Sequence, residues 1–317
     1  MLSFDVICIG DAKIDIFLSL LEENPNIHLN RDTKELCVAY GQKIPVDACS
    51  LQLGGNAYNV AVGLAKLQMK TAVMAEIGKD EFSQKIINGL QSENVNTDFL
   101  LQNANSPSSF SVILSFQQER TIFSKHIERE HNFSFDGIST KWIYLTSLGN
   151  EWEKTYELTE AFAKSSGSKL AFNPGTLQLL TGYQKIKSVL AISDMLFVNK
   201  EEAITILNIK NQISNNELLI SLQKLGPKIV VITDGENGSF AVNEKGEFLT
   251  QAIIKTAIVE KTGAGDAYAS GFLAAMLSNL PIQTAMKWGT INASATMAII
   301  GAQNGLLPRK EMEEKSL

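Results

Sequence analysis

A glycine-rich turn that runs directly into a helical pattern is the part of the sequence best suited to chemistry. Gly263, Ala264 and Gly265 precede an alanine-rich stretch, and Asp266 lies in the same turn. Glycines allow tight backbone geometry, and the first N–H groups of a helix are free donors with a partial positive charge. We therefore expect an anion site here that suits a phosphate. Asp266 is either a favourable first-turn residue or a general base that faces a substrate hydroxyl.

Two better-known phosphate-binding patterns are missing from the chain. Tyr268 occupies the position where G-x-G-x-x-G needs its third glycine, and no Walker A sequence occurs anywhere. A dinucleotide-binding dehydrogenase and a P-loop enzyme are therefore both poor interpretations.

A second glycine turn lies near the N-terminus. Gly54 and Gly55 lead into a predicted helix, and Asn56 and Asn59 lie near its start. Small residues let a ligand approach the backbone, and asparagine side chains offer paired donors and acceptors. A plain glycine turn with an asparagine cap explains the same residues.

Two more polar segments follow predicted strands. Asn199 and Glu202 are three residues apart on one helix face, where they could hold a hydrated Mg²⁺ or form a capping box. Thr233, Gly235 and Gly238 form a T-x-G-x-x-G turn that could touch phosphate oxygens or be an ordinary β-turn.

The order of these four segments resembles the ribokinase-like (PfkB) family of carbohydrate and nucleoside kinases. The likeness runs from GDAKID at 10–15 to NASATMAIIGAQNG at 292–305, and G-A-G-D is its most specific element. The resemblance implies a ribokinase-like three-layer α/β/α sandwich with a central, mostly parallel sheet and a small β lid. It also implies ATP and Mg²⁺ as cofactors.

The resemblance further implies a role for each motif residue. Asp266 would be the base that activates an acceptor hydroxyl, and the amides of Gly263, Ala264 and Gly265 would form the anion hole. On the nucleotide side, Asn199 and Glu202 would hold Mg²⁺ through water. Thr233, Gly235 and Gly238 would line the ATP site, and Asn292 would lie near the adenine. On the acceptor side it implies Asp15, Gly54, Gly55 and Asn59.

The sequence does not decide which acceptor the protein would phosphorylate. A ribose-like sugar is the first choice, because GDAKID places an aspartate where similar sugar kinases use one. An adenosine-type nucleoside is the alternative, and its base could stack on the aromatic side chains of Phe17, Tyr40, Phe110 and Phe116. A non-catalytic ligand-binding relative is a third interpretation, and it predicts loss of the base or of the anion hole.

Monovalent-cation dependence also stays open. Many relatives carry D-T-T before G-A-G-D, where this chain reads Glu260, Lys261 and Thr262. In some members the acidic residue there helps to place a monovalent cation, and Glu260 is longer than the usual aspartate.

Some polar residues outside the motifs receive structural interpretations. We expect His28, His126 and His131 in the lid or on the surface, since they show no metal-ligand spacing. Arg120 is expected to be an exposed arginine on an edge strand, with contact to an acceptor phosphate or carboxylate as the alternative. Asn173 follows a predicted strand and could contact a ligand.

The elements that must position these residues alternate between strand and helix. The expected strands are 5–10, 71–77, 142–148, 169–172, 194–198 and 228–233; the expected helices are 57–67, 80–93, 151–164, from 200, 217–225, 265–278 and 282–300. Repeated β-then-α units imply parallel strands joined by helical crossovers, with helices on both faces of the sheet. The end, RKEMEEKSL, is expected to be a frayed tail.

Two regions break this rhythm, roughly 16–50 and 103–130. The second contains FSVILSF and RTIFSKH, which look like antiparallel strands. We expect both regions to form a lid on a single kinase domain spanning 1–317. An exposed lid edge could pair with its twin in a homodimer.

Composition excludes several other classes. With 44% hydrophobic residues the chain can bury a core, so a mostly disordered protein is excluded. The net charge of −6 argues against a nucleic-acid partner. No apolar run approaches the roughly 18 residues of a membrane helix, and the start lacks a basic signal-peptide region. Cys8, Cys37 and Cys49 suit free thiols in a reducing cytoplasm.

Overall fold

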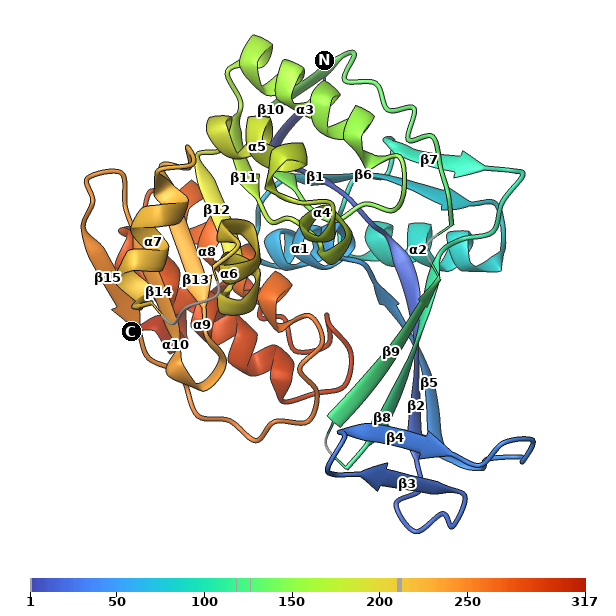
Figure 1. The fold of residues 1–317 in the computed structure, drawn as a ribbon. Helices are drawn as coiled ribbons and strands as arrows, with labels where there is room; N and C mark the ends of the chain where they lie inside the picture. Colours follow the sequence, from blue (N-terminus) through green and yellow to red (C-terminus); the bar gives the residue numbers. More distant parts are fainter. Residues whose placement is uncertain (1, 118, 126, 210–212) are drawn as a thin grey trace.

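A nine-stranded sheet runs through the centre of the molecule, in a computed structural model that describes residues 2–117, 119–125, 127–209 and 213–317 (Figure 1). In pairing order the strands are β15 (Phe248–Gln251), β14 (Ser239–Val242), β13 (Ile229–Thr233), β12 (Met195–Asn199), β11 (Lys169–Phe172), β10 (Ile138–Leu145), β1 (Leu2–Ile9), β6 (Thr71–Gly78) and β7 (Leu100–Asn103). The strands from β13 to β7 run parallel, and β14 and β15 are antiparallel additions at one edge.

Helices cover both faces of this sheet, as the alternation of patterns predicts. Along β1, Val6 and Cys8 belong to one buried cluster and Ile7 and Ile9 to the other, because successive side chains point to opposite faces. The first layer consists of α1 (Asn56–Lys66), α2 (Glu81–Ser92), α8 (Ala264–Leu277), α9 (Ile282–Met297) and α10 (Arg309–Ser316); the second consists of α3 (Trp152–Ser166), α4 (Thr176–Leu180), α5 (Tyr183–Ile192), α6 (Lys200–Leu207) and α7 (Asn215–Gln223). The predicted three-layer α/β/α arrangement is confirmed.

A four-stranded sheet, here called the second sheet, projects beside the central body (Figure 1). Its order is β5 (Val46–Gly54), β2 (Lys13–Leu20), β8 (Phe110–Phe116) and β9 (Glu119–Lys125). The predicted antiparallel pair is confirmed as β8 and β9, although His126 lies outside the described residues. A separate hairpin of β3 (Ile27–Asn30) and β4 (Glu35–Val38) lies at the far end, with His28 exposed on it.

Buried ionisable side chains attach the segment that follows β9 to the central sheet. Glu76 on β6 lies 4.0 Å from the Arg129 guanidinium and 3.7 Å from the His131 imidazole. The expected position was the lid or the surface, and the surface is wrong for His131, because only 2% of it is exposed. Its ring stacks on Phe133, and burial lowers the pKa of His131, which favours its neutral form.

The C-terminal residues correct a second expectation. They form α10 and not a frayed tail, because Met312 is fully buried in the layer of α8 and α9. The Arg309 guanidinium lies 4.7 Å from the centre of the Trp288 ring. No helix in the described part of the chain is long and apolar enough to cross a membrane.

Candidate active site

The carboxyl ends of the parallel strands open onto a cavity of about 870 Å³. Ser147, Asn173, Asn199 and Thr233 line it, each at the end of a strand or just after one. The second sheet contributes another wall, which includes Asp15. This edge of an open α/β sheet is where ligands usually bind, and the volume suits small molecules.

The start of α8 brings Asp266 to this cavity. Gly263 is the N-cap of the helix with φ of 82°, and a Cβ there would lie 2.4 Å from the Ala302 Cβ. Glycine is therefore required at this turn, both for the backbone angle and for the close approach. Asp266 is the third residue of the helix and is almost fully buried.

Free amide donors surround Asp266, though not all three that the sequence predicted. The Ala264 N–H donates to the Lys261 carbonyl at 3.3 Å, so this donor already has a partner, and its place in the anion hole stays a prediction. The N–H groups of Gly263, Gly265 and Asp266 have no acceptor among the described residues. The start of the helix thus offers three donors at the cavity wall, which suit a phosphate oxygen.

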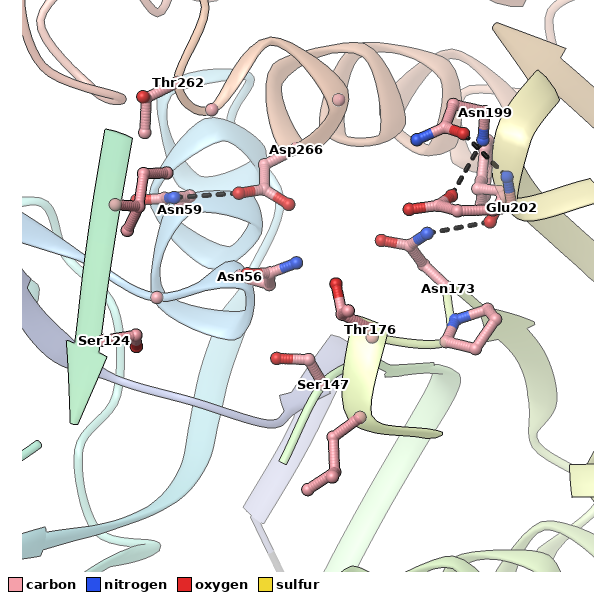
Figure 2. Close-up of a pocket in the computed structure, with 18 of the residues that line it drawn as sticks. Asn56, Asn59, Ser124, Ser147, Asn173, Thr176, Asn199, Glu202, Thr262 and Asp266 are labelled. Carbon is pink, nitrogen blue, oxygen red and sulfur yellow. Dashed lines mark hydrogen bonds between the residues drawn. The ribbon is translucent and has the colours of Figure 1, made fainter. Parts of the chain in front are cut away.

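The Asp266 carboxylate is held on one side and open on the other. Asn59 Nδ2 donates to its Oδ2 at 2.8 Å, while the other oxygen points into the cavity (Figure 2). Burial raises the pKa of Asp266 to about 7, opposed by the Asn59 hydrogen bond and the positive charge of Lys13. A carboxylate with this pKa can take a proton from a hydroxyl near neutral pH.

Asn59 supports Asp266 and is itself supported. Its Oδ1 accepts a 2.8 Å hydrogen bond from Gln303 Nε2, which also donates to the Leu53 carbonyl. Both polar atoms of Asn59 are engaged, so Asn59 positions Asp266; it also lines the cavity, and its contact with the acceptor stays a prediction. Sequence reasoning missed Gln303, although it lies in the C-terminal segment that carries the resemblance.

Asp15 lies on β2 with 5% of its surface exposed. Burial raises the pKa of Asp15, while the charge of Lys13 and a hydrogen bond from Ser111 lower it. A Cβ on Gly54 would lie only 2.2 Å from Asp15 Oδ2, so glycine there makes room for the carboxylate. Gly54 does not line the cavity, whereas Gly55 does, with φ of 99°.

Asn199 and Glu202 form the capping box that was the alternative to a magnesium site. Asn199 Oδ1 accepts from the Glu202 N–H at 2.9 Å, and Glu202 Oε2 accepts from the Asn199 N–H at 2.8 Å. Both residues nevertheless line the cavity, and the second oxygen of Glu202 has no partner among the described residues. Partial burial raises the pKa of Glu202.

These residues fit a metal ion held mainly by water. No group of three or more His, Cys, Asp or Glu side chains that could hold a metal occurs in the described ranges. Mg²⁺ binds through one or two carboxylates and keeps several waters, and Glu202 with its open oxygen meets that need.

Arg120 and Glu260 join the second sheet to the loop before α8. The Arg120 guanidinium lies 3.0 Å from Glu260 Oε1, which also accepts from the N–H groups of Lys261 and Thr262 and from the Thr262 hydroxyl. Strand β9 begins beside Thr262 (Figure 2). Arg120 lies on an edge strand, as expected, but it is a half-buried and paired side chain at the cavity wall and not a fully exposed one.

Comparison with known proteins decides the family. The sequence pattern described as "pfkB family carbohydrate kinase" matches residues 22–310. The chain belongs to this family. It is therefore a carbohydrate kinase, and the predicted resemblance is confirmed.

Individual pfkB relatives and neighbours cover almost the whole chain. A 5-dehydro-2-deoxygluconokinase of Halalkalibacterium halodurans is 25% identical, over 98% of this chain and 93% of the relative. An Arabidopsis thaliana ribokinase complexed with ribose and ATP has a TM-score of 0.79 at 18% identity, covering 99% of both chains. An adenosine kinase from Sinorhizobium meliloti has a TM-score of 0.80 at 19% identity, also covering 99% of both chains. These two structures establish the fold, and their different names show that the fold does not select the acceptor.

The T-x-G-x-x-G turn of this pfkB chain is only partly at the cavity. Thr233 lines it, whereas Gly235 and Gly238 lie in the turn behind, both at positive φ. A Cβ on Gly238 would lie 2.2 Å from the Gln251 carbonyl oxygen, so this glycine permits close packing against β15. Asp234 is paired with Lys200 at 2.8 Å, which offsets its negative charge near the site.

Asn292, another residue of the pfkB pattern, lies in the core and away from the cavity. It is fully buried between α8 and α9, where its Nδ2 donates to the Ala267 carbonyl and to Ser270 Oγ. Its Oδ1 accepts from the Leu307 N–H at 3.0 Å. Both polar atoms are used inside the core, and Asn292 does not line the cavity, so it holds α8 and α9 together. Its expected place near the adenine stays a prediction.

Proposed function

We propose that this carbohydrate kinase transfers the γ-phosphoryl group of ATP to a hydroxyl group of a small sugar, with Asp266 as the general base. The observation that carries the proposal is the Asp266 carboxylate, which has a pKa of about 7 and lies beside the free amides at the start of α8. Base and anion site occur on one helix turn at one cavity wall.

The reaction follows from this geometry. Asp266 takes the proton of the acceptor hydroxyl, whose oxygen forms a bond to the γ-phosphorus while the bond to the bridging oxygen of ADP breaks. The N–H groups of Gly263, Gly265 and Asp266 donate to the phosphoryl oxygens as the group moves. Positioning and electrostatic stabilisation do most of the work in phosphoryl transfer.

Glu202 and Asn199 would hold Mg²⁺ on the nucleotide side through its bound waters. When bound there, Mg²⁺ would neutralise charge on the ATP phosphates. Thr233 lines the same part of the wall and would contact the ATP phosphates. The Arg120 guanidinium already compensates Glu260, where a monovalent cation would act, so we expect no requirement for such an ion.

Asp15 and Asn56, both at the cavity wall, would bind the acceptor's hydroxyls. The choice of a sugar over a nucleoside is supported by the aromatic side chains, because Phe17, Tyr40, Phe110 and Phe116 do not line the cavity. The curated relatives named 5-dehydro-2-deoxygluconokinase add a gluconate derivative to the ribose-like sugars as a candidate. A non-catalytic relative is disfavoured because the base and the free amides are both in place.

An assay of ADP release across sugars, sugar acids and nucleosides tests the activity. The Asp266→Asn variant should bind ATP with little change by calorimetry, and its turnover should fall about 10²- to 10⁴-fold. Asp47→Asn, an exposed carboxylate of the second sheet, is the matched control and should be unaffected. Near-normal turnover of Asp266→Asn would remove the base role, and no ADP release with any acceptor would remove the kinase proposal.

We also propose that the second sheet and its hairpin act as a lid, formed by residues 16–50 and 103–130, on a single kinase domain spanning 1–317. Closure would exclude water from the phosphoryl group. Two copies would associate through the edge strand β9, where Phe123 is 58% exposed. The three free cysteines agree with a reducing cytoplasm.

A further inference from the structure

Of the cations at the cavity wall, one differs from the rest. Arg120 pairs with Glu260 at 3.0 Å, and Lys261 pairs with Glu119 at 3.9 Å. The side chain of Lys13 also lines the cavity, but its ammonium group has no hydrogen bond or ion pair within the described part of the chain. Its ammonium group is therefore free to meet a ligand.

The position of Lys13 places it on the acceptor side of the cavity. It is the first residue of β2, and Asp15 follows two residues later on the same face of the strand. In the register of β2 and β5 it lies opposite Gly54, just before the start of α1. The nucleotide-side residues Asn199 and Thr233 come from strands of the other sheet.

The charge of Lys13 reaches both carboxylates that the reaction uses. It lowers the pKa of Asp15 and of Asp266, although it makes an ion pair with neither. Asp15 is instead engaged by Ser111, and Asp266 by Asn59. An acceptor that touches Asp15 and Asp266 thus lies within the field of an unpaired ammonium group.

We propose that Lys13 binds a carboxylate of the acceptor, so that the substrate class is sugar acids and not neutral sugars. The proposal rests on the kinase function argued above. A charge-assisted hydrogen bond to a carboxylate is about twice as strong as a neutral one, and in a partly buried site it discriminates by about 10- to 100-fold. A neutral sugar leaves Lys13 unpaired and does not gain the free energy of this charge-assisted hydrogen bond.

Two probes that differ at one carbon test the proposal. In 5-keto-D-gluconate one terminal carbon is a carboxylate, and in L-sorbose the same carbon carries a hydroxymethyl group. For the natural chain kcat/KM should be at least 10-fold higher with the acid. Lys13→Met should lower kcat/KM for the acid about 10- to 100-fold, mainly through KM, and change the value for L-sorbose less than threefold.

Two further variants distinguish recognition of the acceptor's carboxylate by Lys13 from a general effect of the substitution on the structure. Lys13→Arg keeps the charge and should retain part of the preference for the acid. Lys125→Met removes a lysine of the same sheet that does not line the cavity, and it should change neither acceptor. Lys13 also lowers the pKa of Asp266, so these rates are compared at about pH 9, where Asp266 is ionised in both proteins. If Lys13→Met lowers kcat equally for both acceptors at that pH, Lys13 serves the transferring phosphoryl group and the proposal is wrong.

Calorimetric titration of the protein with each acceptor measures binding without any need for turnover. The acid should bind the natural chain more tightly than L-sorbose, and Lys13→Met should abolish that difference. Equal binding of the two probes to the natural chain, or a preference that survives in Lys13→Met, would overturn the proposal. Absence of ADP release with a Lys13-dependent preference in binding would count against the kinase function alone.

Discussion

At the scale of single residues, Asp266 shows how the fold tunes one carboxylate. Burial raises its pKa to about 7, Asn59 and Lys13 favour the ionised form, and Asp15 and Glu202 oppose it. The result is a carboxylate that is partly ionised at neutral pH and is held in place through Asn59 and Gln303. Such tuning makes a carboxylate useful for taking a proton from an alcohol.

Two consequences of this pKa can be measured. As a base Asp266 must be ionised, so kcat/KM should rise with pH up to about 7 and level off above it. The raised pKa also means that the folded state holds the proton more tightly than the unfolded chain. This stabilising contribution is complete below about pH 4 and is lost as the pH rises through about 7.

Asp266→Asn should therefore be more stable than the natural chain at pH 8, by on the order of a few kcal/mol, and the gain should shrink toward pH 4. Urea unfolding at several pH values measures this trend. Asp47→Asn should show no such dependence on pH. A gain that grows toward acid would contradict the assigned pKa shift.

At the scale of elements, the sequence predicts what local patterns encode. The helix at 265–278 and the strand at 228–233 agree with α8 and β13 to within one residue, because apolar periodicity and glycine turns are local signals. Strand β5 was not predicted. Its first four residues are exposed, so the strand does not show a continuous alternation of buried and exposed side chains. The Asp266–Asn59 hydrogen bond joins residues 207 positions apart, and no local pattern encodes it.

Asn292 and Arg120 show that the local sequence does not decide which surroundings a polar side chain meets. Asn292 lies in the core, and Arg120 lies at the cavity wall. The family resemblance predicts Asn292 near the adenine, and the structure shows that its side chain joins α8 and α9. Arg120 looked like a surface arginine, yet it meets a carboxylate 140 positions away. Only the packing of distant elements decides whether a polar side chain faces the cavity or the core.

The contact between β9 and the loop before α8 leads to a prediction at this scale. Glu260 holds the backbone N–H groups of Lys261 and Thr262, and Arg120 compensates its charge. Arg120→Gln and Glu260→Ala should each lower kcat about 10-fold with little change in ATP binding. The two residues should couple by about 1.4 kcal/mol in a double-mutant cycle of kcat, because either single change already removes the whole 10-fold effect.

The neighbouring pair of Glu119 and Lys261 supplies the matched control. Its atoms are 3.9 Å apart and both side chains are more than half exposed, so its coupling should be below about 1 kcal/mol. Additive effects of Arg120→Gln and Glu260→Ala would show that Arg120 does not position the loop.

At the scale of the whole molecule, the site is complete only where two sheets meet. Asp266, Glu202 and Thr233 come from the central body, whereas Lys13 and Asp15 come from the second sheet. The loop of Glu260 touches β9 through Arg120, so the second sheet is in contact with the central body on this side of the cavity. Association of two copies through this sheet would fix the lid edge and protect its open strand.

The edge strand β9 carries the last prediction. Phe123 is 58% exposed on the face of β9 that points away from Ser124 and the cavity, and an isologous contact would bury it in both copies. Light scattering should show a dimer for the natural chain and a monomer for Phe123→Asp. Phe248→Asp, at the exposed edge strand β15 of the central sheet, should stay dimeric. A natural chain that is monomeric at micromolar concentration, or a Phe123→Asp variant that still dimerises, would rule out this interface.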